Sequence, residues 1–394
     1  MTTTTPRDTK TPTDGRPPRI QLNTLVGMRG ILMFTVFFGH CAIAYVFNRD
    51  ISDAFVKLDI GPAQAVLALF FMLSGFVLAW VARPGESKRA FWRRRAVKIF
   101  PNHVVTWVAG LILMISFGVY TSWWEVLPSL FLLQSWIPVE GVLAGTNGPA
   151  WSLSCELFMY AMFPFALAWA LRMDARKLWR WLIGLAAGVI LFTALVGLTV
   201  PSEPKALGQD VSAYQFYILI FFPLVRLPEF VIGVLIARLV ITGQWRPVRA
   251  RWTWLLFGIG WVVSMNLPNP LGFVAPFLPA LILGLGGAAT ADINESKNLF
   301  TRRWAMWLGD RSFAFYLIHG NVLIFSEKAI GSGPYPTPYA ALFVLGVLTV
   351  SLALAHVLHT RVENPMMKHW ARPRRKPASA TAAAPPAPSA QVQR

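Results

Sequence analysis

The stretch RGILMFTVFFGH, residues 29–40, decides the fold class, because it places two polar side chains in an otherwise apolar run. Arg29 begins the stretch, His40 ends it, and apolar residues continue through CAIAYVF to residue 47. A spanning helix needs about 20 predominantly apolar residues, so this run predicts a transmembrane helix over residues 25–47. A charged side chain inside a membrane costs at least about 2.5 kcal/mol, and such residues mark functional sites.

The whole chain repeats this apolar character. Of its 394 residues, 55% are hydrophobic and 14% charged, whereas soluble domains carry about 25% charged residues. The apolar blocks predict an all-α polytopic membrane protein with about ten transmembrane helices. The predicted spans are 25–47, 62–82, 99–120, 149–171, 181–200, 214–237, 252–267, 272–290, 304–326 and 339–358. The apolar segment 126–138 is too short to span, so we expect it at the interface or re-entering the membrane.

The net charge of +18 follows the predicted topology. With the N-terminus in the cytoplasm, 29 of the 36 Lys and Arg residues fall in cytoplasmic segments and 4 in outer loops. This bias predicts both termini in the cytoplasm and a multi-pass protein of the cell membrane, surrounded by lipid. Because the basic residues lie in short runs between apolar blocks, we do not expect a nucleic-acid partner.

The ends of the chain differ from its middle in composition. Residues 1–24 are a polar, Thr- and Pro-rich tail without the apolar core of a signal peptide. Residues 369–394 are a basic, Pro/Ala-rich tail, and we expect both tails to be disordered. The membrane domain is therefore residues 25–368. The two cysteines, Cys41 and Cys155, form neither a disulfide framework nor a metal-binding motif, and we expect packing roles for them and no metal site.

Arg29 and His40 are predicted to share one face of their helix. Eleven residues at about 100° each come within about 20° of three full turns, and they separate the side chains by about 16 Å along the axis. Arg29 then lies toward the cytoplasm and His40 deeper, toward the outer side. The alternative is that His40 is a structural hydrogen-bonding residue and that Arg29 reaches back to the interface.

The fourth span opens with GPAWSLSCELFMYAMFP, in which Ser152, Glu156 and Tyr160 share a face. Glu156 and His40 are each predicted about seven residues below the outer ends of their spans, at a similar depth. A buried carboxylate needs a partner, so we expect Glu156 to pair with His40. A packing contact between polar groups of two helices is the alternative.

The most basic stretch, ESKRAFWRRRAVKIFPNH, contains Arg95 and Lys98 on one helix face. Cations at a cytoplasmic entrance suit a phosphate-rich ligand. The alternative is a topology signal that also contacts anionic lipid. Elsewhere we expect Arg226 and Glu229 to form an internal ion pair, and we leave open whether His319, one turn after Tyr316, joins the polar cluster.

Five motifs in this order resemble the acyltransferase-3 family of integral membrane O-acyltransferases. The resemblance covers roughly residues 20–365 and rests on LVGMRGILMFTVFFGH, LFFMLSGFVLAW, RRRAVKIFP, WSLSCELFMY and LGDRSFAFYLIH. The family's Arg-x-x-Arg segment corresponds to Arg95 and Lys98 here. Lysine keeps the charge but loses bidentate pairing.

The resemblance implies that His40 is catalytic and that Glu156, which matches the family's acidic residue, assists it. It implies donor binding by Arg29, Arg95 and Lys98. We further expect four residues to contact the acceptor or to support those that do: Trp151, Ser152, Tyr316 and His319.

The implied activity is the transfer of an acetyl or other short acyl group from acyl-CoA, as a co-substrate and without a bound cofactor. The implied acceptor is a hydroxyl of a sugar or of a glycosylated natural product such as a macrolide-type antibiotic, and the alternative is a cell-surface glycan. In the expected mechanism His40 accepts the hydroxyl proton while Glu156 orients the His40 imidazole.

Two other classes of function are alternatives to an enzyme. A proton-coupled secondary transporter would use the same Arg, His and Glu as a proton path. No internal repeat is visible, which counts against it. A structural scaffold gives no reason for several charged residues at one depth. Acceptor, acyl chain length and oligomeric state stay open.

Overall fold

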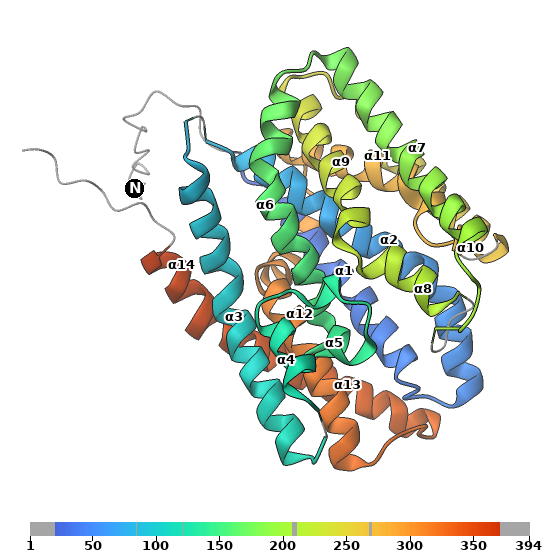
Figure 1. The fold of residues 1–394 in the computed structure, drawn as a ribbon. Helices are drawn as coiled ribbons and strands as arrows, with labels where there is room; N and C mark the ends of the chain where they lie inside the picture. Colours follow the sequence, from blue (N-terminus) through green and yellow to red (C-terminus); the bar gives the residue numbers. More distant parts are fainter. Residues whose placement is uncertain (1–19, 84, 120, 207–210, 268–269, 371–394) are drawn as a thin grey trace, which may run out of the picture.

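The structure is a bundle of α-helices (Figure 1). It is a computed structural model that describes residues 20–83, 85–119, 121–206, 211–267 and 270–370. Within these ranges no strand forms, which confirms the all-α class. Nearly all of both predicted tails, 1–24 and 369–394, lies outside the described residues, so their disorder stays a prediction.

The long helices follow the predicted spans. Their bounds are α1 Asn23–Ile43, α2 Arg49–Val81, α3 Lys88–Ser116, α6 Trp151–Leu171, α7 Ala175–Thr199, α9 Pro223–Ile241, α10 Ala250–Asn266, α11 Leu278–Ile293, α12 Arg303–Ile330 and α13 Thr337–Leu358. Short elements connect them: α4 Trp123–Leu130, α5 Glu140–Ala144, α8 Ala213–Phe216 and α14 Asn364–Trp370, with the π-helices η3 Tyr217–Phe221 and η6 His359–Glu363.

Eight helical stretches among the described residues are long and apolar enough to cross a membrane. Every predicted span contains a helix, but α10 and α12 are not among the eight. Helix α10 has only 17 residues, and α12 carries charged residues such as Asp310 and Arg311. The class of membrane protein is therefore confirmed, whereas the count of ten spans stays a prediction.

The first span ends earlier than the sequence predicts. Helix α1 stops at Ile43, and Tyr45 in the turn to α2 has a positive φ of 54°, which no α-helix accommodates. The predicted end at residue 47 was wrong because this turn is itself apolar. His40 consequently lies four residues, about 6 Å, nearer to the end of its helix than expected.

Glycines bring two pairs of helices into close contact. On α2 and α9, a Cβ atom added at Gly75 would lie 2.0 Å from the Phe230 carbonyl oxygen, and one at Gly233 would lie 1.9 Å from that of Met72. Gly309 of α12 lies equally close to the backbone of α1. Small residues allow such backbone contact in membrane proteins, where helices associate through packing. These contacts set α1, α2, α9 and α12 as the centre of the bundle.

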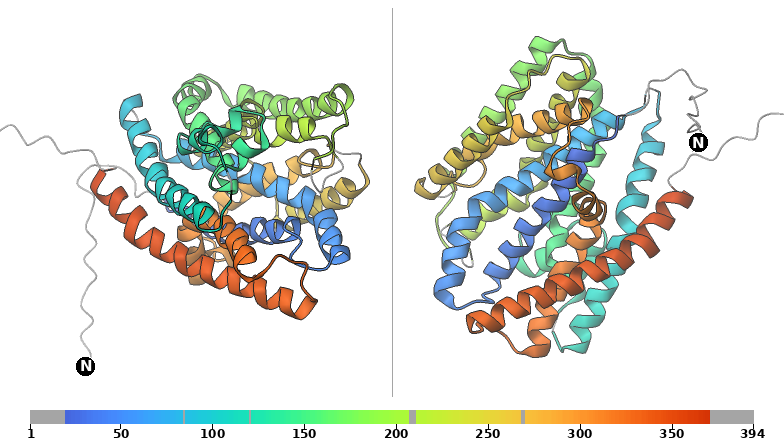
Figure 2. Two further views of the ribbon diagram at one scale, coloured as in Figure 1. Left: turned by 60° about the horizontal axis from the view of Figure 1, so that its bottom comes forward. Right: turned by 180° about the vertical axis from the view of Figure 1, so that it is seen from behind.

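Two segments cover this centre. The segment 126–138 forms the end of α4 and a 3-10 turn, Gln134–Trp136, so it is too short to span, as predicted. Helices α13 and α14 are joined by η6 into one continuous line, and its end packs beside α3 (Figure 2). This contact brings Glu363 to the basic start of α3.

Candidate active site

A first cavity, of about 150 Å³, lies among α1, α2, α3, α6 and α12. It gathers the predicted donor-binding residues Arg29, Arg95 and Lys98 together with Glu156. The shared faces predicted on α3 and α6 are observed, because Ser152, Glu156 and Tyr160 all line it. We call this space the basic cavity.

Two of its guanidinium groups have no acidic partner. Among the described residues no carboxylate forms an ion pair with Arg29 or Arg95. The Arg95 Nε atom is buried without a hydrogen-bond partner, and its guanidinium lies 5.9 Å from the centre of the Tyr160 ring. Cations held at a cavity wall without a counter-ion favour an anionic ligand.

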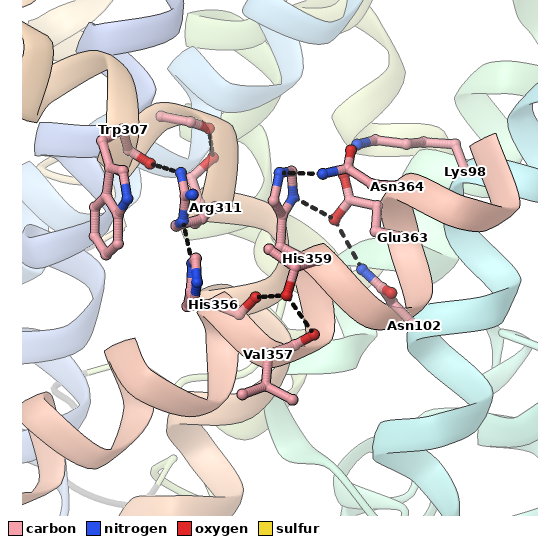
Figure 3. A network of polar contacts seen from close by, with 12 residues as sticks. Lys98, Asn102, Trp307, Arg311, His356, Val357, His359, Glu363 and Asn364 are labelled. Carbon is pink, nitrogen blue, oxygen red and sulfur yellow. Dashed lines mark hydrogen bonds and ion pairs between the residues drawn. The ribbon is translucent and has the colours of Figure 1, made fainter. Parts of the chain in front are cut away.

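Lys98, which also lines the basic cavity, is held differently, by a polar network (Figure 3). It forms an ion pair with Glu363, which is buried and also accepts a 2.9 Å hydrogen bond from Asn102 Nδ2. His359 lies 3.4 Å from the same carboxylate. Part of the Lys98 charge is thus neutralised by the protein, so Arg29 and Arg95 remain the cations available to a ligand.

Figure 3 also places Arg311, which falls within the predicted span 304–326. Its Nε donates to His356 Nδ1 at 2.9 Å, and its guanidinium lies over the Trp307 ring at 4.2 Å. The expected ion pair between Arg226 and Glu229 is confirmed, with 3.0 Å between Nη2 and Oε2 and both side chains buried. Neither group lines the basic cavity.

Glu156 is bonded to its own neighbours. Its Oε1 accepts hydrogen bonds from Ser74 Oγ at 2.6 Å and from Tyr160 OH at 2.9 Å. These hydroxyls satisfy the carboxylate within the basic cavity.

A second cavity, of about 110 Å³, contains His40. It lies nearer the turn between α1 and α2, and its wall includes Asp59, Gln64 and Trp151. We call it the His40 cavity. The two cavities share Leu67, Phe70 and Tyr316, which form the partition between them. Arg29 and His40 thus face adjoining cavities, as their common helix stripe predicts.

His40 pairs with His319. The Nδ1 atom of His40 lies 3.1 Å from Nε2 of His319, and Nδ1 of His319 lies 3.2 Å from the Phe315 carbonyl oxygen. A carbonyl oxygen only accepts, so we assign a proton to Nδ1 of His319. Its Nε2 then accepts from Nδ1 of His40. This order leaves the Nε2 lone pair of His40 free to accept a proton.

The surroundings of His319 support a neutral ring. It is buried and stacks on Phe315, with ring centroids 5.5 Å apart and planes 3° apart. Burying a charged imidazolium among apolar rings without a counter-ion is costly. His319 therefore orients His40. It belongs to the polar cluster, which answers the question that the sequence left open.

Tyr316 fixes the partition from its own side. Its hydroxyl accepts from Ser152 Oγ and donates to the Pro149 carbonyl oxygen, both at 2.7 Å. Ser152 thus supports Tyr316, and Trp151 forms part of the wall of the His40 cavity. Of the four residues expected near the acceptor, Tyr316 thus lines both cavities, Ser152 lines the basic cavity and Trp151 lines the His40 cavity, whereas His319 contacts His40 directly.

The expected pairing of His40 with Glu156 is corrected. Across the described residues neither a hydrogen bond nor an ion pair joins them, and they line different cavities. Helix α1 ends at Ile43, so His40 lies in its last turn. The buried carboxylate did need partners, but two hydroxyls supply them.

Sequence reasoning missed four polar residues. Ser74 lines the basic cavity and Asp59 lines the His40 cavity, whereas Asn102 and Glu363 belong to the network that holds Lys98. Ser74 lies in the motif LFFMLSGFVLAW, Asn102 falls inside the predicted span 99–120, and Glu363 follows the last predicted span, all at positions that hydropathy does not distinguish. Asp59 falls in the predicted outer loop, three residues before the second predicted span. An acidic residue so near a predicted span is the signal that could have identified Asp59.

Comparisons with known proteins identify the family of this chain. The profile of a family described as an acyltransferase domain matches residues 22–356. The chain is 33% identical to Acyltransferase MdmB of Streptomyces mycarofaciens over 371 residues, which cover 91% of this chain and 95% of that protein. It is 25% identical to the exopolysaccharide production protein ExoZ of Rhizobium meliloti (strain 1021) over 313 residues, or 76% of this chain and 88% of that one. No solved structure matches significantly. Because the family profile and the first relative both span most of the chain, this protein belongs to the acyltransferase-3 family of membrane enzymes.

Proposed function

We propose that the protein is an acyl-CoA-dependent O-acyltransferase of the cell membrane that acylates a sugar or a glycosylated natural product, such as a macrolide-type antibiotic. The acyl group is acetyl or another short chain. One observation carries the proposal: two cavities meet at Leu67, Phe70 and Tyr316, one with unpaired cations and the other with His40.

The basic cavity suits the donor. Arg29 and Arg95 have no acidic partner among the described residues, and guanidinium groups bind phosphate oxygens through paired hydrogen bonds. Lys98 adds charge while Glu363 holds it in place. In this proposal the phosphates of acyl-CoA bind at these cations, and the thioester reaches toward the partition.

His40 then serves as the general base. Its Nε2 takes the proton of the acceptor hydroxyl as the hydroxyl oxygen attacks the thioester carbonyl carbon. The carbon–sulfur bond breaks, the CoA thiolate leaves, and the imidazolium returns the proton to its sulfur. His319 keeps His40 in the required tautomer, and Glu156 orders the hydroxyls of the basic cavity.

The acceptor has a second candidate within the same chemistry. The match to a protein of exopolysaccharide production favours a cell-surface glycan, which also offers sugar hydroxyls. Purified protein in detergent, given labelled acetyl-, propionyl- and longer acyl-CoA with panels of both acceptor types, distinguishes the two.

The same assay tests the activity itself. We expect acceptor-dependent thioester cleavage and its loss by about 10²–10⁴-fold in His40→Ala. Melting in detergent verifies that the variant folds. Undiminished turnover in folded His40→Ala would refute the mechanism. A proton-coupled transporter would instead move solute in proteoliposomes and cleave no thioester.

A further inference from the structure

The His40 cavity contains a carboxylate that the mechanism above does not use. Asp59, on α2, lines the cavity and forms no ion pair or hydrogen bond with any of the described residues. The Oε1 atom of Gln64, which lines the same cavity, is buried and equally without a hydrogen-bond partner. A folded protein rarely leaves a buried acceptor such as Gln64 Oε1 unsatisfied, so a ligand that reaches this atom and the half-buried Asp59 is the expected partner.

The walls around Asp59 are aromatic. Phe70, Trp151, Phe216 and Tyr316 all line the cavity. Aromatic faces attract ammonium groups, and cages of such rings recognise substituted amines. A carboxylate and aromatic faces together make a surface that favours a cation.

The two cavities also differ in charge. Arg29, Arg95 and Lys98 line the basic cavity, whereas among the described residues neither Lys nor Arg lines the His40 cavity. The protein therefore offers cations to one substrate and an anion to the other. An anionic donor and a cationic acceptor would each be attracted to one cavity and repelled from the other.

We propose that the acceptor carries a protonated amine, as an amino sugar does, and that Asp59 binds this ammonium group beside His40. The proposal deepens the proposed function and rests on it for the transfer step. The amine binds Asp59 and the aromatic wall, while a hydroxyl of the same molecule is presented to Nε2 of His40. Gln64 Oε1 accepts a further hydrogen bond from the bound amine or a hydroxyl.

The ionisation of Asp59 is compatible with this role. Burial raises the pKa of Asp59 to about 6, so the carboxylate remains mostly charged at pH 7. Its position three residues before the predicted second span leaves it near the end of the bundle, where an acceptor can approach.

A binding experiment tests the proposal without requiring turnover. Octyl 2-amino-2-deoxyglucoside, a cation at pH 7, is compared with its N-acetyl form, which has the same ring hydroxyls but no charge. Their dissociation constants are measured by calorimetry with the full-length protein in detergent. We expect the amine to bind about tenfold more tightly than the amide, because hydrogen bonds between charged groups are the stronger ones.

Two variants isolate the charge of Asp59. Asp59→Asn is expected to abolish the preference for the amine, whereas Asp50→Asn, which removes an exposed carboxylate in the first turn of the same helix, is expected to keep it. Both variants lose one negative charge, so effects of net charge and of micelle partitioning cancel. Melting in detergent verifies that both fold.

The outcomes separate this inference from the proposed function. Equal binding of amine and amide to the wild-type protein, no binding of either, or a preference that survives in Asp59→Asn would each overturn the role of Asp59. Transfer to neutral acceptors could still proceed in that case. Absence of thioester cleavage with every acceptor would refute the proposed function instead, whatever the binding constants are.

Discussion

A neutral histidine accepts a proton on only one of its nitrogens, so the partner of His40 decides which nitrogen that is. The chain from the Phe315 carbonyl through His319 to His40 leaves Nε2 as the acceptor. His319 thus positions His40 without touching the substrate.

We expect His319→Ala to lower kcat about tenfold or more, because His40 then samples both tautomers and several orientations. The loss should be smaller than the roughly 10²–10⁴-fold loss expected for His40→Ala, and the acyl-CoA KM should stay unchanged. Steady-state kinetics measures both constants. His356→Ala, which changes a histidine paired with Arg311 away from both cavities, is the matched control. Equal kcat values for His319→Ala and this control would rule out the positioning role.

Arg95 carries a second prediction at this scale. Each hydrogen bond to a charged group contributes about 1.5–3 kcal/mol, so Arg95→Ala should raise the donor KM roughly ten- to a hundredfold. Arg89→Ala, an exposed residue of the same basic stretch that lines neither cavity, should leave it unchanged. Donor titrations of the two folded variants decide the matter. A donor KM that is the same in both would leave Arg95 as a topology signal.

The sequence predicted some residue contacts better than others. Arg29 and His40 lie on one stripe because helix periodicity alone determines this. The partner of His40 depends on how α12 packs against α1 and on where α1 ends, and neither follows from periodicity. The sequence predicted Glu156 as the partner of His40 and left the role of His319 open, and only the three-dimensional arrangement selects His319.

At the scale of elements, hydropathy located every long helix because each must remain apolar over most of its length. It failed at boundaries, where apolar turns extend a run without extending the helix. The predicted span 214–237 likewise consists of α8, η3 and α9, with a change of direction at Pro223, which has no backbone N–H.

The contact between α2 and α9 gives a prediction about this scale. In Gly233→Ala the new methyl group would collide with the Met72 carbonyl oxygen, so the helices must separate and the melting temperature should fall by several degrees or more. Gly188→Ala on α7, where a Cβ meets nothing within 4 Å, should be neutral or stabilising, since alanine favours helix by about 1 kcal/mol. Thermal unfolding in detergent compares the two. Similar melting temperatures would mean that α2 and α9 do not pack as closely as described.

At the scale of the whole molecule, orientation in the membrane is the open prediction. The distribution of 29 cytoplasmic and 4 outer basic residues predicts both termini inside. Reporter fusions after residues 200 and 394 should therefore read outside and inside. The reverse result at both sites would place the basic cavity on the outer side, where acyl-CoA is not expected.

The partition between the cavities has a further consequence, which concerns electrical insulation. If the cavities open toward opposite faces, the three residues that line both, Leu67, Phe70 and Tyr316, must block ions as well as divide substrates. A membrane potential of 100 mV drives each elementary charge with about 2.3 kcal/mol, so even a narrow water-filled gap would conduct. We expect Phe70→Gly to make proteoliposomes leak protons faster than wild-type protein does, as followed with an enclosed pH-sensitive dye. An enzyme that handles substrates from two compartments would then depend on three side chains to preserve the voltage between them.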